Sequence, residues 1–234
     1  MVSMELSIII PVFNEKLFIA ETLKRVSAVD LDKEVIVIDD CSSDGTRELL
    51  QELAGASKGD EGFKFLFQDK NYGKGAALRR GFKEAMGDVI IVQDAELECD
   101  PQDYYALLQP IKMGLASVVY GSRFLDGSCQ TMSFRHYFAN RFLTFLANVF
   151  IGQSLTDMET CYKVFRREVL DGIEIKENRF GFEPEITAKI ANKGYQIHEV
   201  PISYHPRTYC EGKKIKWKDG FEAIWCIIKY NLIG

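Results

Sequence analysis

Apolar and polar positions follow two alternating patterns along the first 123 residues. Short, β-branched apolar runs suit strands that are buried on both faces, and they occur at 5–12, 34–39, 63–67, 88–93 and 116–121. Between these runs, apolar residues recur at helical spacing over 16–28, 44–54, 74–86 and about 101–113. This alternation predicts an α/β fold with a mostly parallel central sheet and helices on both faces.

The pattern changes after residue 124. An aromatic-rich helix is predicted over 134–151, followed by helices over 181–193 and 217–232 and short strands at 162–166 and 196–202. No Pro-rich linker, internal repeat or low-complexity tract interrupts the chain. With 234 residues, 47% of them hydrophobic, the chain can bury the core of one ordinary domain, so we expect a single domain over 1–234.

Composition excludes some classes of function. The formal net charge of −5 gives no overall attraction to nucleic acid, although a basic cluster stands at 207–218. The six cysteines have neither the spacing of a zinc site nor the density of a disulfide scaffold, which favours a reducing, cytosolic setting. Met1 leads almost directly into a strand-like run, so no signal peptide is expected. No apolar stretch approaches the roughly 20 residues that span a bilayer, so any membrane contact is expected to be peripheral.

The clearest chemistry follows the strand at 88–93, where Asp94, Glu96 and Glu98 stand at alternate positions. Carboxylates gathered in this way repel one another unless a cation lies among them, and hard oxygen ligands suit Mg²⁺ or Mn²⁺. The alternative is a solvated acidic loop before a helix whose dipole favours carboxylates. Ligands of open α/β sheets bind beyond the carboxyl ends of the strands, and this position favours the metal interpretation.

Two other strand ends carry polar turns. Ser42 and Asp44 are explained by helix capping, whereas Asp40 continues an apolar strand and is better suited to accept a hydrogen bond from a base or ribose. The glycine turn at 71–75 contains Lys74 but lacks the full spacing of the phosphate-binding glycine motifs, so structure explains it as well as function does.

Together these segments resemble the family 2 glycosyltransferases, and within them the polyprenyl-phosphate sugar synthases, the group of dolichyl-phosphate mannose synthase. The resemblance covers nearly the whole chain and rests on an ordered set of motifs: Pro11-Val12-Phe13-Asn14-Glu15, the run from Asp39 to Thr46, Gln93-Asp94-Ala95-Glu96-Leu97-Glu98, Gly121-Ser122-Arg123, Arg207 and Gly212-Lys213-Lys214. It implies a fold of the GT-A type, with 1–123 as the nucleotide-sugar-binding half and 124–234 as the acceptor half, ending in an amphipathic helix.

The resemblance also implies roles on the donor side. The nucleoside pocket would be lined by Pro11, Phe13, Glu15, Ile38 and Asp40. The donor would be touched by Asp94, Ala95 and Glu96, the metal would be surrounded by Asp94, Glu96 and Glu98, and the donor phosphates would be gripped by Arg207 and Lys213. Glu96 stands where the family usually has aspartate, and Glu98 where it often has glutamine. These departures retain oxygen ligation and leave the preferred metal open.

On the acceptor side, Arg123 and Arg135 would hold a lipid phosphate, because a planar guanidinium can donate two hydrogen bonds at once. A surface ion pair is the alternative for each. Asp157 and Glu159 would face the donor, and one of them would act as general base if the acceptor were a hydroxyl. The expected catalytic residues are Asp94, Glu96, Asp157 and Arg123.

The reaction that the resemblance implies is inverting transfer of a hexose from a GDP- or UDP-linked donor to a polyprenyl phosphate, dolichyl or undecaprenyl, with Mg²⁺ or Mn²⁺. One alternative is transfer to a sugar hydroxyl in polysaccharide or cell-envelope synthesis, and another is a nucleotide-sugar-binding protein without turnover. Aromatic and aliphatic residues in 134–151 and 217–233, beside lysines at 213–218, suggest peripheral contact with the cytosolic face of a membrane. The alternative is that both helices pack these residues on the sheet.

Overall fold

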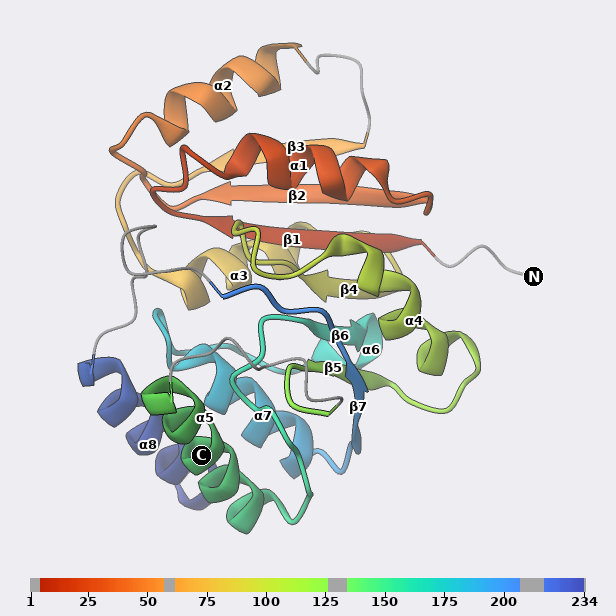
Figure 1. Cartoon of the computed structure of the whole chain (residues 1–234), viewed down its shortest axis with the longest axis vertical. Coiled ribbons are helices and arrows are strands. Elements are labelled where there is room, and N and C mark those ends of the chain that lie inside the picture. The colour runs from red at the N-terminus through yellow and green to blue at the C-terminus, as the bar shows by residue number, and fades with distance from the viewer. Residues whose placement is uncertain (1–4, 57–61, 126–133, 207–216, 234) are drawn as a thin grey trace.

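Seven strands form one sheet in the order β3-β2-β1-β4-β6-β5-β7 (Figure 1). The structure is a computed structural model that describes residues 5–56, 62–125, 134–206 and 217–233. The strands are β1 (Leu6–Val12), β2 (Lys33–Asp39), β3 (Phe63–Phe67), β4 (Val89–Val92), β5 (Val118–Ser122), β6 (Lys163–Arg166) and β7 (Ile197–Pro201). Every one of them lies within two residues of a segment that the apolar pattern predicts.

One strand of the sheet runs against the others. β1 pairs in parallel with β2 and β4, β2 with β3, and β5 with β7, whereas β6 lies antiparallel between β4 and β5. A reversed strand begins at the edge where its neighbours end. The segment before β6 therefore reaches the same edge as the residues that follow β4 and β5.

Helices cover both faces of the sheet, as the alternation predicts. The helices on one face are α1 (Ile19–Ala28), α2 (Thr46–Ala56) and α4 (Tyr104–Lys112), the last following a 3₁₀ turn, η1 (Pro101–Asp103). Those on the other face are α3 (Lys74–Glu84), α6 (Arg167–Leu170) and α7 (Phe182–Asn192). The side chains of β1 divide between the two cores, because Ile8 and Ile10 belong to the first and Ile9 to the second.

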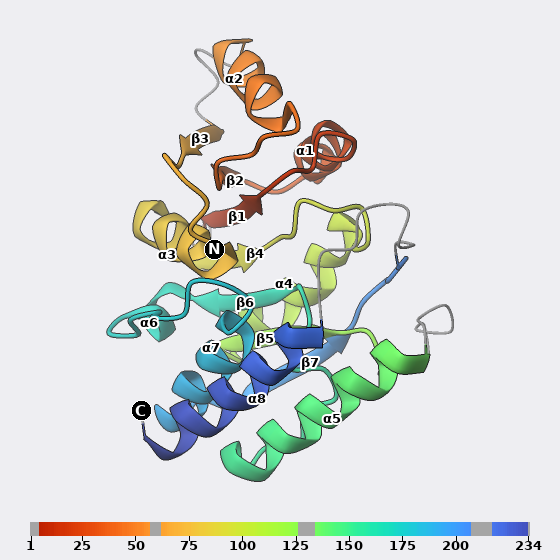
Figure 2. The same ribbon diagram turned by 90° about the vertical axis from the view of Figure 1, so that its left-hand side faces the viewer.

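Two helices lie outside these layers. α5 (Phe134–Ile151) and α8 (Trp217–Leu232) pack against each other and against α7, at the end of the molecule far from α2 (Figure 2). Their shared core includes Leu143 and Ala147 from α5 and Ala223 and Ile227 from α8. The large apolar side chains that stay exposed are Phe134, Phe138, Phe142, Phe145 and Val149 of α5 and Phe221, Trp225 and Leu232 of α8. The apolar surface of these two helices is therefore only partly used in packing.

Membrane crossing and cysteine pairing can both be checked within the described ranges. No helix there is long and apolar enough to span a membrane. Cys99 and Cys161, which lie 62 residues apart in the sequence, are paired in a disulfide. The sequence analysis, which judged the cysteines by spacing and density, did not anticipate this pair. Spacing gave no sign of the pair because the two residues come from different halves of the chain.

Candidate active site

The loops after β1 and β2 are held together by side-chain hydrogen bonds. The Asn14 amide donates to Ser42 Oγ at 2.9 Å, and the Ser43 amide donates to Asn14 Oδ1 at 2.8 Å. Among the predicted nucleoside residues, Pro11 lies directly beside Ile38 in the β1–β2 register. Phe13 and Glu15 follow in the β1 loop, with Phe13 half-buried and Glu15 buried. The fold thus gathers these four residues at one edge of the sheet, where their role in binding stays a prediction.

Asp40 organises the neighbouring loop. Its carboxylate accepts hydrogen bonds from Gln68 Nε2 at 2.6 Å and from the amides of Tyr72 and Gly73 at 2.8 and 2.7 Å. Burial raises the pKa of Asp40, although the three hydrogen bonds act in the opposite direction. A carboxylate offers about four lone-pair sites, so most of its capacity is used within the chain. Its contact with a base or ribose stays a prediction.

Lys74 opens α3 and joins two carboxylates from distant parts of the chain. Its ammonium nitrogen lies 2.8 Å from Asp94 Oδ1 and 2.9 Å from Glu183 Oε1, in the first turn of α7. The glycines on either side of Lys74 permit this position, because a Cβ on either would lie 2.3 Å from a backbone carbonyl oxygen at 177–178. Burial by itself lowers the pKa of Lys74, but the two carboxylates outweigh it and hold the pKa above its usual range. The glycine turn is therefore a structural device that places a charge beside Asp94.

The loop that carries Asp94 is anchored on two sides. The carbonyl oxygen of Ala95, a buried residue, accepts a hydrogen bond from Thr22 Oγ1 of α1 at 3.0 Å. At the other end of the loop, the His205 amide donates to the Glu98 carbonyl at 2.8 Å. Glu96 lies between these anchors, Asp94 directly precedes the first of them, and both side chains are partly exposed. The backbone of the loop is fixed while these carboxylates stay within reach of a ligand.

The donor chemistry of this loop fits a hard divalent cation. Glu98 Oε2 accepts a hydrogen bond from Tyr204 Oη at 3.1 Å, and Asp94 is paired with Lys74. Within the part of the chain that the structure describes, no three His, Cys, Asp or Glu side chains are grouped so as to hold a metal ion. Mg²⁺ beside nucleotide phosphates commonly takes one or two carboxylates, and water and phosphate oxygens fill its remaining positions. Asp94 and Glu96 suit that kind of site, and the three-carboxylate set stays a prediction.

Arg123 and Asp157 form a buried, bidentate ion pair after β5. Nε and Nη2 of Arg123 each lie 2.7 Å from one carboxylate oxygen of Asp157, and the Arg123 amide donates to the same carboxylate at 3.1 Å. Glu199 of β7 holds the loop in place by accepting the amide hydrogens of Thr156 and Asp157. Burial would lower the pKa of Arg123, but the Asp157 carboxylate raises it above its usual range. The Arg123 guanidinium therefore stays charged despite its burial.

Tyr204 connects this ion pair to the carboxylate loop. The Arg123 guanidinium lies over the Tyr204 ring, 5.2 Å from its centroid, and the hydroxyl of the same tyrosine donates to Glu98. The backbones of Tyr204 and Cys99 also form an antiparallel bridge. Sequence analysis missed Tyr204 and Glu183, because neither stands in a motif and both reach the site only through the fold.

The roles of three further predicted site residues stay predictions. Arg135 lies in the first turn of α5 with its side chain exposed, and its contact with an acceptor phosphate stays a prediction. Arg207 and Lys213 lie outside the described residues. Their assignment to the donor phosphates therefore also stays a prediction.

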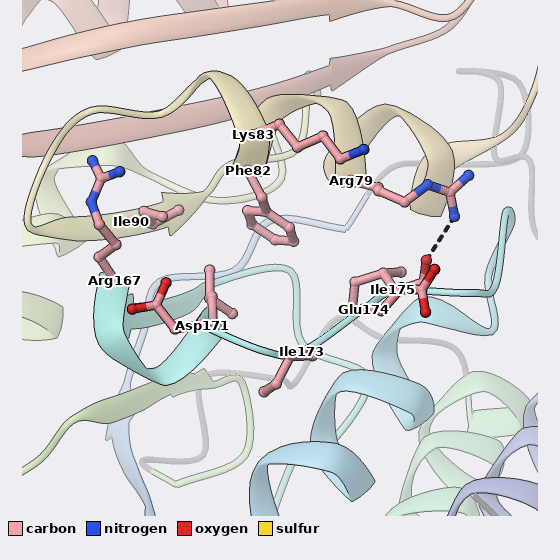
Figure 3. Close-up of a pocket in the computed structure, with 10 residues that line it drawn as sticks. Arg79, Phe82, Lys83, Ile90, Arg167, Asp171, Ile173, Glu174 and Ile175 are labelled. Carbon is pink, nitrogen blue, oxygen red and sulfur yellow. Dashed lines mark hydrogen bonds between the residues drawn. The ribbon is translucent and has the colours of Figure 1, made fainter.

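A separate pocket of about 250 Å³ lies between α3 and the segment around α6 (Figure 3). Arg79, on its rim, donates to the Ile175 carbonyl at 2.8 Å, and Arg167 donates to the carbonyls of Ala85 and Gly87. Ile90 in its wall lies near the start of β4, whereas Asp94 follows the end of that strand. The pocket therefore lies toward the opposite edge of the sheet, and its arginines serve to hold the backbone.

A family model described as "Glycosyl transferase family 2" matches residues 7–173 of this chain. The chain belongs to glycosyltransferase family 2. The matched range contains the Asp94 loop, Arg123 and Asp157, whereas Glu183, Glu199 and Tyr204 lie beyond it. As a family 2 glycosyltransferase, the chain is an enzyme of sugar transfer.

Curated relatives resemble nearly the whole of this glycosyltransferase. The dolichol-phosphate mannosyltransferase of Pyrococcus furiosus is 31% identical over 249 aligned residues, which cover 99% of this chain and 68% of the relative. The undecaprenyl-phosphate 4-deoxy-4-formamido-L-arabinose transferase of Pseudomonas fluorescens is 28% identical, over 88% of this chain and 59% of the relative. The glycosyltransferase AglD of Haloferax volcanii is 26% identical, over 87% of this chain. The chain spans only a third of AglD's length, at 33%.

Solved structures support the same fold. Glucosyl-3-phosphoglycerate synthase from Mycobacterium tuberculosis in complex with UDP matches with a TM-score of 0.75 and 18% identity. The match covers 99% of this chain and 81% of the synthase. Another structure of that synthase contains Mn²⁺, UDP and phosphoglyceric acid, and matches with a TM-score of 0.71. The GT-A type of fold expected from the sequence is therefore confirmed.

Proposed function

We propose that this family 2 glycosyltransferase transfers a hexose from a UDP- or GDP-linked donor to the phosphate of a polyprenyl lipid, with inversion at the anomeric carbon. Two relatives support this acceptor, because their names contain dolichol phosphate and undecaprenyl phosphate. In-line displacement needs the donor diphosphate and the acceptor on opposite sides of the sugar. Asp94 after β4 would lie on the donor side and Arg123 after β5 on the acceptor side, both at one edge of the sheet.

The choice of a phosphate acceptor rests on the ion pair between Asp157 and Arg123. Both carboxylate oxygens of Asp157 accept hydrogen bonds from the guanidinium, so this carboxylate is already engaged within the chain. Burial raises the pKa of Glu159, so that this carboxyl group holds its proton at neutral pH. A hydroxyl acceptor needs a general base, whereas a phosphate is already anionic and needs none. The acceptor side therefore suits a phosphate better than a hydroxyl.

The donor side is proposed to work by positioning and charge. Asp94 and Glu96 would hold Mg²⁺ or Mn²⁺, which when bound neutralises the departing diphosphate. Pro11, Phe13, Glu15, Ile38 and Asp40 would bind the nucleoside, and Arg207 and Lys213 would hold the phosphates. Lys74 keeps Asp94 in place through its ion pair. Each of these groups acts by holding a ligand, and no covalent enzyme intermediate is required.

The exposed apolar surface of α5 and α8 suits the headgroup region of a membrane, where a polyprenyl phosphate would be met. Phe138, Phe142 and Trp225 are each more than half exposed. Aromatic side chains of this kind favour the interface between lipid and water. We place the enzyme at the cytosolic face of a membrane on this ground.

Transfer assays with matched acceptors test the proposed reaction. Purified chain is incubated with radiolabelled UDP-glucose or GDP-mannose and Mn²⁺, together with undecaprenyl phosphate, dolichyl phosphate or undecaprenol. Label should enter the lipid phase only when the lipid carries phosphate. Transfer to a sugar hydroxyl, with none to either lipid phosphate, would make the polysaccharide acceptor the better candidate. If the chain turns over none of these donors, a nucleotide-sugar-binding protein without catalysis becomes the better candidate.

Vesicle co-sedimentation tests the membrane contact separately. The triple variant Phe138→Ser, Phe142→Ser and Trp225→Ser should stay in the supernatant, whereas the unchanged chain sediments with anionic vesicles. A matched control replaces three apolar residues that are exposed elsewhere: Leu17, Met86 and Leu115. Equal loss of sedimentation in both triple variants would contradict a specific role for α5 and α8.

A further inference from the structure

Two glutamate side chains near the ion pairs each keep a buried oxygen that has no hydrogen-bond partner. Over the described residues, these atoms are Glu159 Oε1 and Glu183 Oε2. Glu183 is only 5% exposed, and its other oxygen is the one bound by Lys74. Leaving a buried acceptor unpaired costs about 1–3 kcal/mol, and more for a charged group. Such atoms are uncommon in folded proteins and call for an explanation.

Two lysines that interact with these glutamates, the buried Lys163 and the partly buried Lys74, do not supply the missing hydrogen bonds. Lys163 donates to the carbonyls of Met158 and Thr160, at 2.9 and 2.6 Å, and its ammonium lies 4.6 Å from the centroid of the Tyr120 ring. Lys74 is divided between Asp94 and the other oxygen of Glu183. Both ammonium groups therefore contact other acceptors than the two unpaired oxygens.

A series of interactions links the two glutamates to the donor and acceptor residues of the proposed reaction. Glu183 is joined to Asp94 through Lys74, and Glu159 stands two positions after Asp157. The two carboxyl groups also act on each other, because the pKa of Glu159 is raised first by burial and then by the charge of Glu183. In a direct displacement, the sugar must occupy the space between leaving group and acceptor. A sugar held there would lie beside these two glutamates.

We propose that Glu183, together with Glu159, binds hydroxyl groups of the transferred sugar and so selects donors whose hexose carries those hydroxyls unmodified. This inference rests on the proposed function and names the feature of the donor that is recognised. A sugar hydroxyl is a neutral hydrogen-bond donor. It would therefore satisfy the unpaired oxygen of Glu183 while Lys74 keeps its ion pair with Asp94. A site built to bind a hydroxyl also rejects an analogue that lacks it, because the buried group is then left unpaired.

Calorimetric binding measurements separate recognition of the sugar from recognition of the nucleotide. Titrations of the full chain with UDP, UDP-glucose, GDP and GDP-mannose, each with Mg²⁺, give the ratio of nucleotide-sugar affinity to nucleotide affinity. Glu183→Leu should lower this ratio by about 10- to 100-fold, the effect of one hydrogen bond to a charged group. Affinity for the nucleotide alone should change less than about twofold. Glu183→Gln, which keeps one acceptor oxygen, should restore part of the ratio, and Glu159→Leu should lower it less.

Glu168, an exposed glutamate beside β6, provides the matched control. Glu168→Leu should leave the ratio unchanged, and thermal unfolding should show that all variants fold. Deoxy analogues of the preferred donor, each lacking one hydroxyl, complete the test. One of them should bind the unchanged chain about 10- to 100-fold more weakly than the parent donor and bind Glu183→Leu as well as the parent does.

Three outcomes would overturn the proposal. If the Glu183 variants lose nucleotide and nucleotide-sugar affinity equally, Glu183 serves only to hold Lys74. If every deoxy donor binds as the parent does, no hydroxyl is recognised at these oxygens. If the unchanged chain binds neither nucleotide sugar, the proposed function fails as well. That result differs from one in which the chain binds nucleotide sugars but the Glu183 variants keep the same ratio of nucleotide-sugar to nucleotide affinity, which would overturn only this inference.

Discussion

The first and second halves of the sheet bring polar groups to the same edge in different ways. In the first half, parallel strands end in loops whose buried groups are satisfied locally, as when Asp40 accepts three hydrogen bonds from its neighbours. In the second half, the antiparallel strand β6 is preceded by a segment that contains Asp157 and Glu159. There, Glu159 and Glu183 retain oxygens without partners.

In the first half, the hydrogen bonds of the buried polar groups are made within the free chain. In the second half, a ligand would supply the hydrogen bonds that two buried oxygens lack. Satisfied buried groups rigidify a loop and hold it ready for binding. Unsatisfied ones carry a free-energy cost that a ligand can remove. The first half is therefore expected to respond to mutation mainly through stability, and the second half also through selectivity.

Asp94 lies where the halves meet, and its replacement should have the largest effect. Asp94→Asn should lower kcat by about 10³-fold, because it removes charge from the residue proposed to hold the cation. Its side chain is 26% exposed, so the free energy of unfolding should change by less than about 1 kcal/mol. Steady-state kinetics and urea unfolding check the two effects, with the exposed Asp171→Asn as control. Unchanged kcat would remove Asp94 from the catalytic residues.

Arg123→Ala should produce the largest loss of stability. Removing one partner of a buried ion pair leaves the other charge uncompensated, which costs about 3–5 kcal/mol in the free energy of unfolding. Arg25→Ala offers a control, since its pair with Glu21 is exposed, and its effect should stay within about 0.5 kcal/mol. Urea unfolding of both variants is the measurement. Equal effects would show that burial of the Arg123–Asp157 pair carries no extra cost.

Two substitutions, one in each half of the sheet, compare a fully hydrogen-bonded buried carboxylate with one that has an unpaired oxygen, through their effects on the free energy of unfolding. Asp40→Ala should cost about 2–4 kcal/mol, because Gln68 and two backbone amides lose their acceptor. Glu183→Gln should cost less than about 1 kcal/mol, because it removes a buried charge of which one oxygen is unpaired. Both values come from urea unfolding in the absence of ligand. A larger loss for Glu183→Gln would reverse the comparison.

The smallest of these effects is a dependence of stability on pH. The folded chain keeps a proton on Glu159 where an unfolded glutamate, with its ordinary pKa of 4.5, has lost it. The folded state then binds more protons, so the free energy of unfolding falls as pH rises from 5 to 7. Asp40 and Glu199 act in the same direction, because burial raises the pKa of both. Groups whose pKa is lowered, such as Asp44 and Glu177, act at lower pH.

Glu159→Gln should reduce this fall by about 1–2 kcal/mol, since one pKa unit corresponds to about 1.4 kcal/mol. Urea unfolding at pH 5 and pH 7 measures the change, and Glu168→Gln is the exposed control. The same slope in the unchanged chain and in Glu159→Gln would show that Glu159 titrates normally.

The local elements could be predicted because apolar periodicity is a property of consecutive residues. The boundary of α1 shows the limit of that approach. Its apolar spacing begins near residue 16, yet the helix begins at Ile19, after a turn in which the amides of Phe18 and Ile19 donate to the Glu15 carbonyl. Periodicity also carries no information on strand direction, so the reversal of β6 was not predicted.

The site was predictable where its residues stand in motifs. Asp94, Arg123 and Asp157 follow or precede strands in recognisable runs, and the fold brings them to one edge. Glu183 was missed because it lies in the first turn of a helix, where acidic residues are ordinary. Its importance comes from Lys74, which belongs to a distant helix. Contacts of this kind depend on tertiary packing and leave no trace in spacing.

The hydrogen bond from the His205 amide to the Glu98 carbonyl can be used to follow opening of the loop that carries Asp94, Glu96 and Glu98. An amide exchanges its hydrogen with solvent only when its hydrogen bond opens, so the exchange rate at this position measures how often the loop separates from the segment at 202–205. Deuterium uptake at one amide would thus follow the arrival of a cation or nucleotide with no probe attached to the protein. It would do so even in variants that have lost turnover.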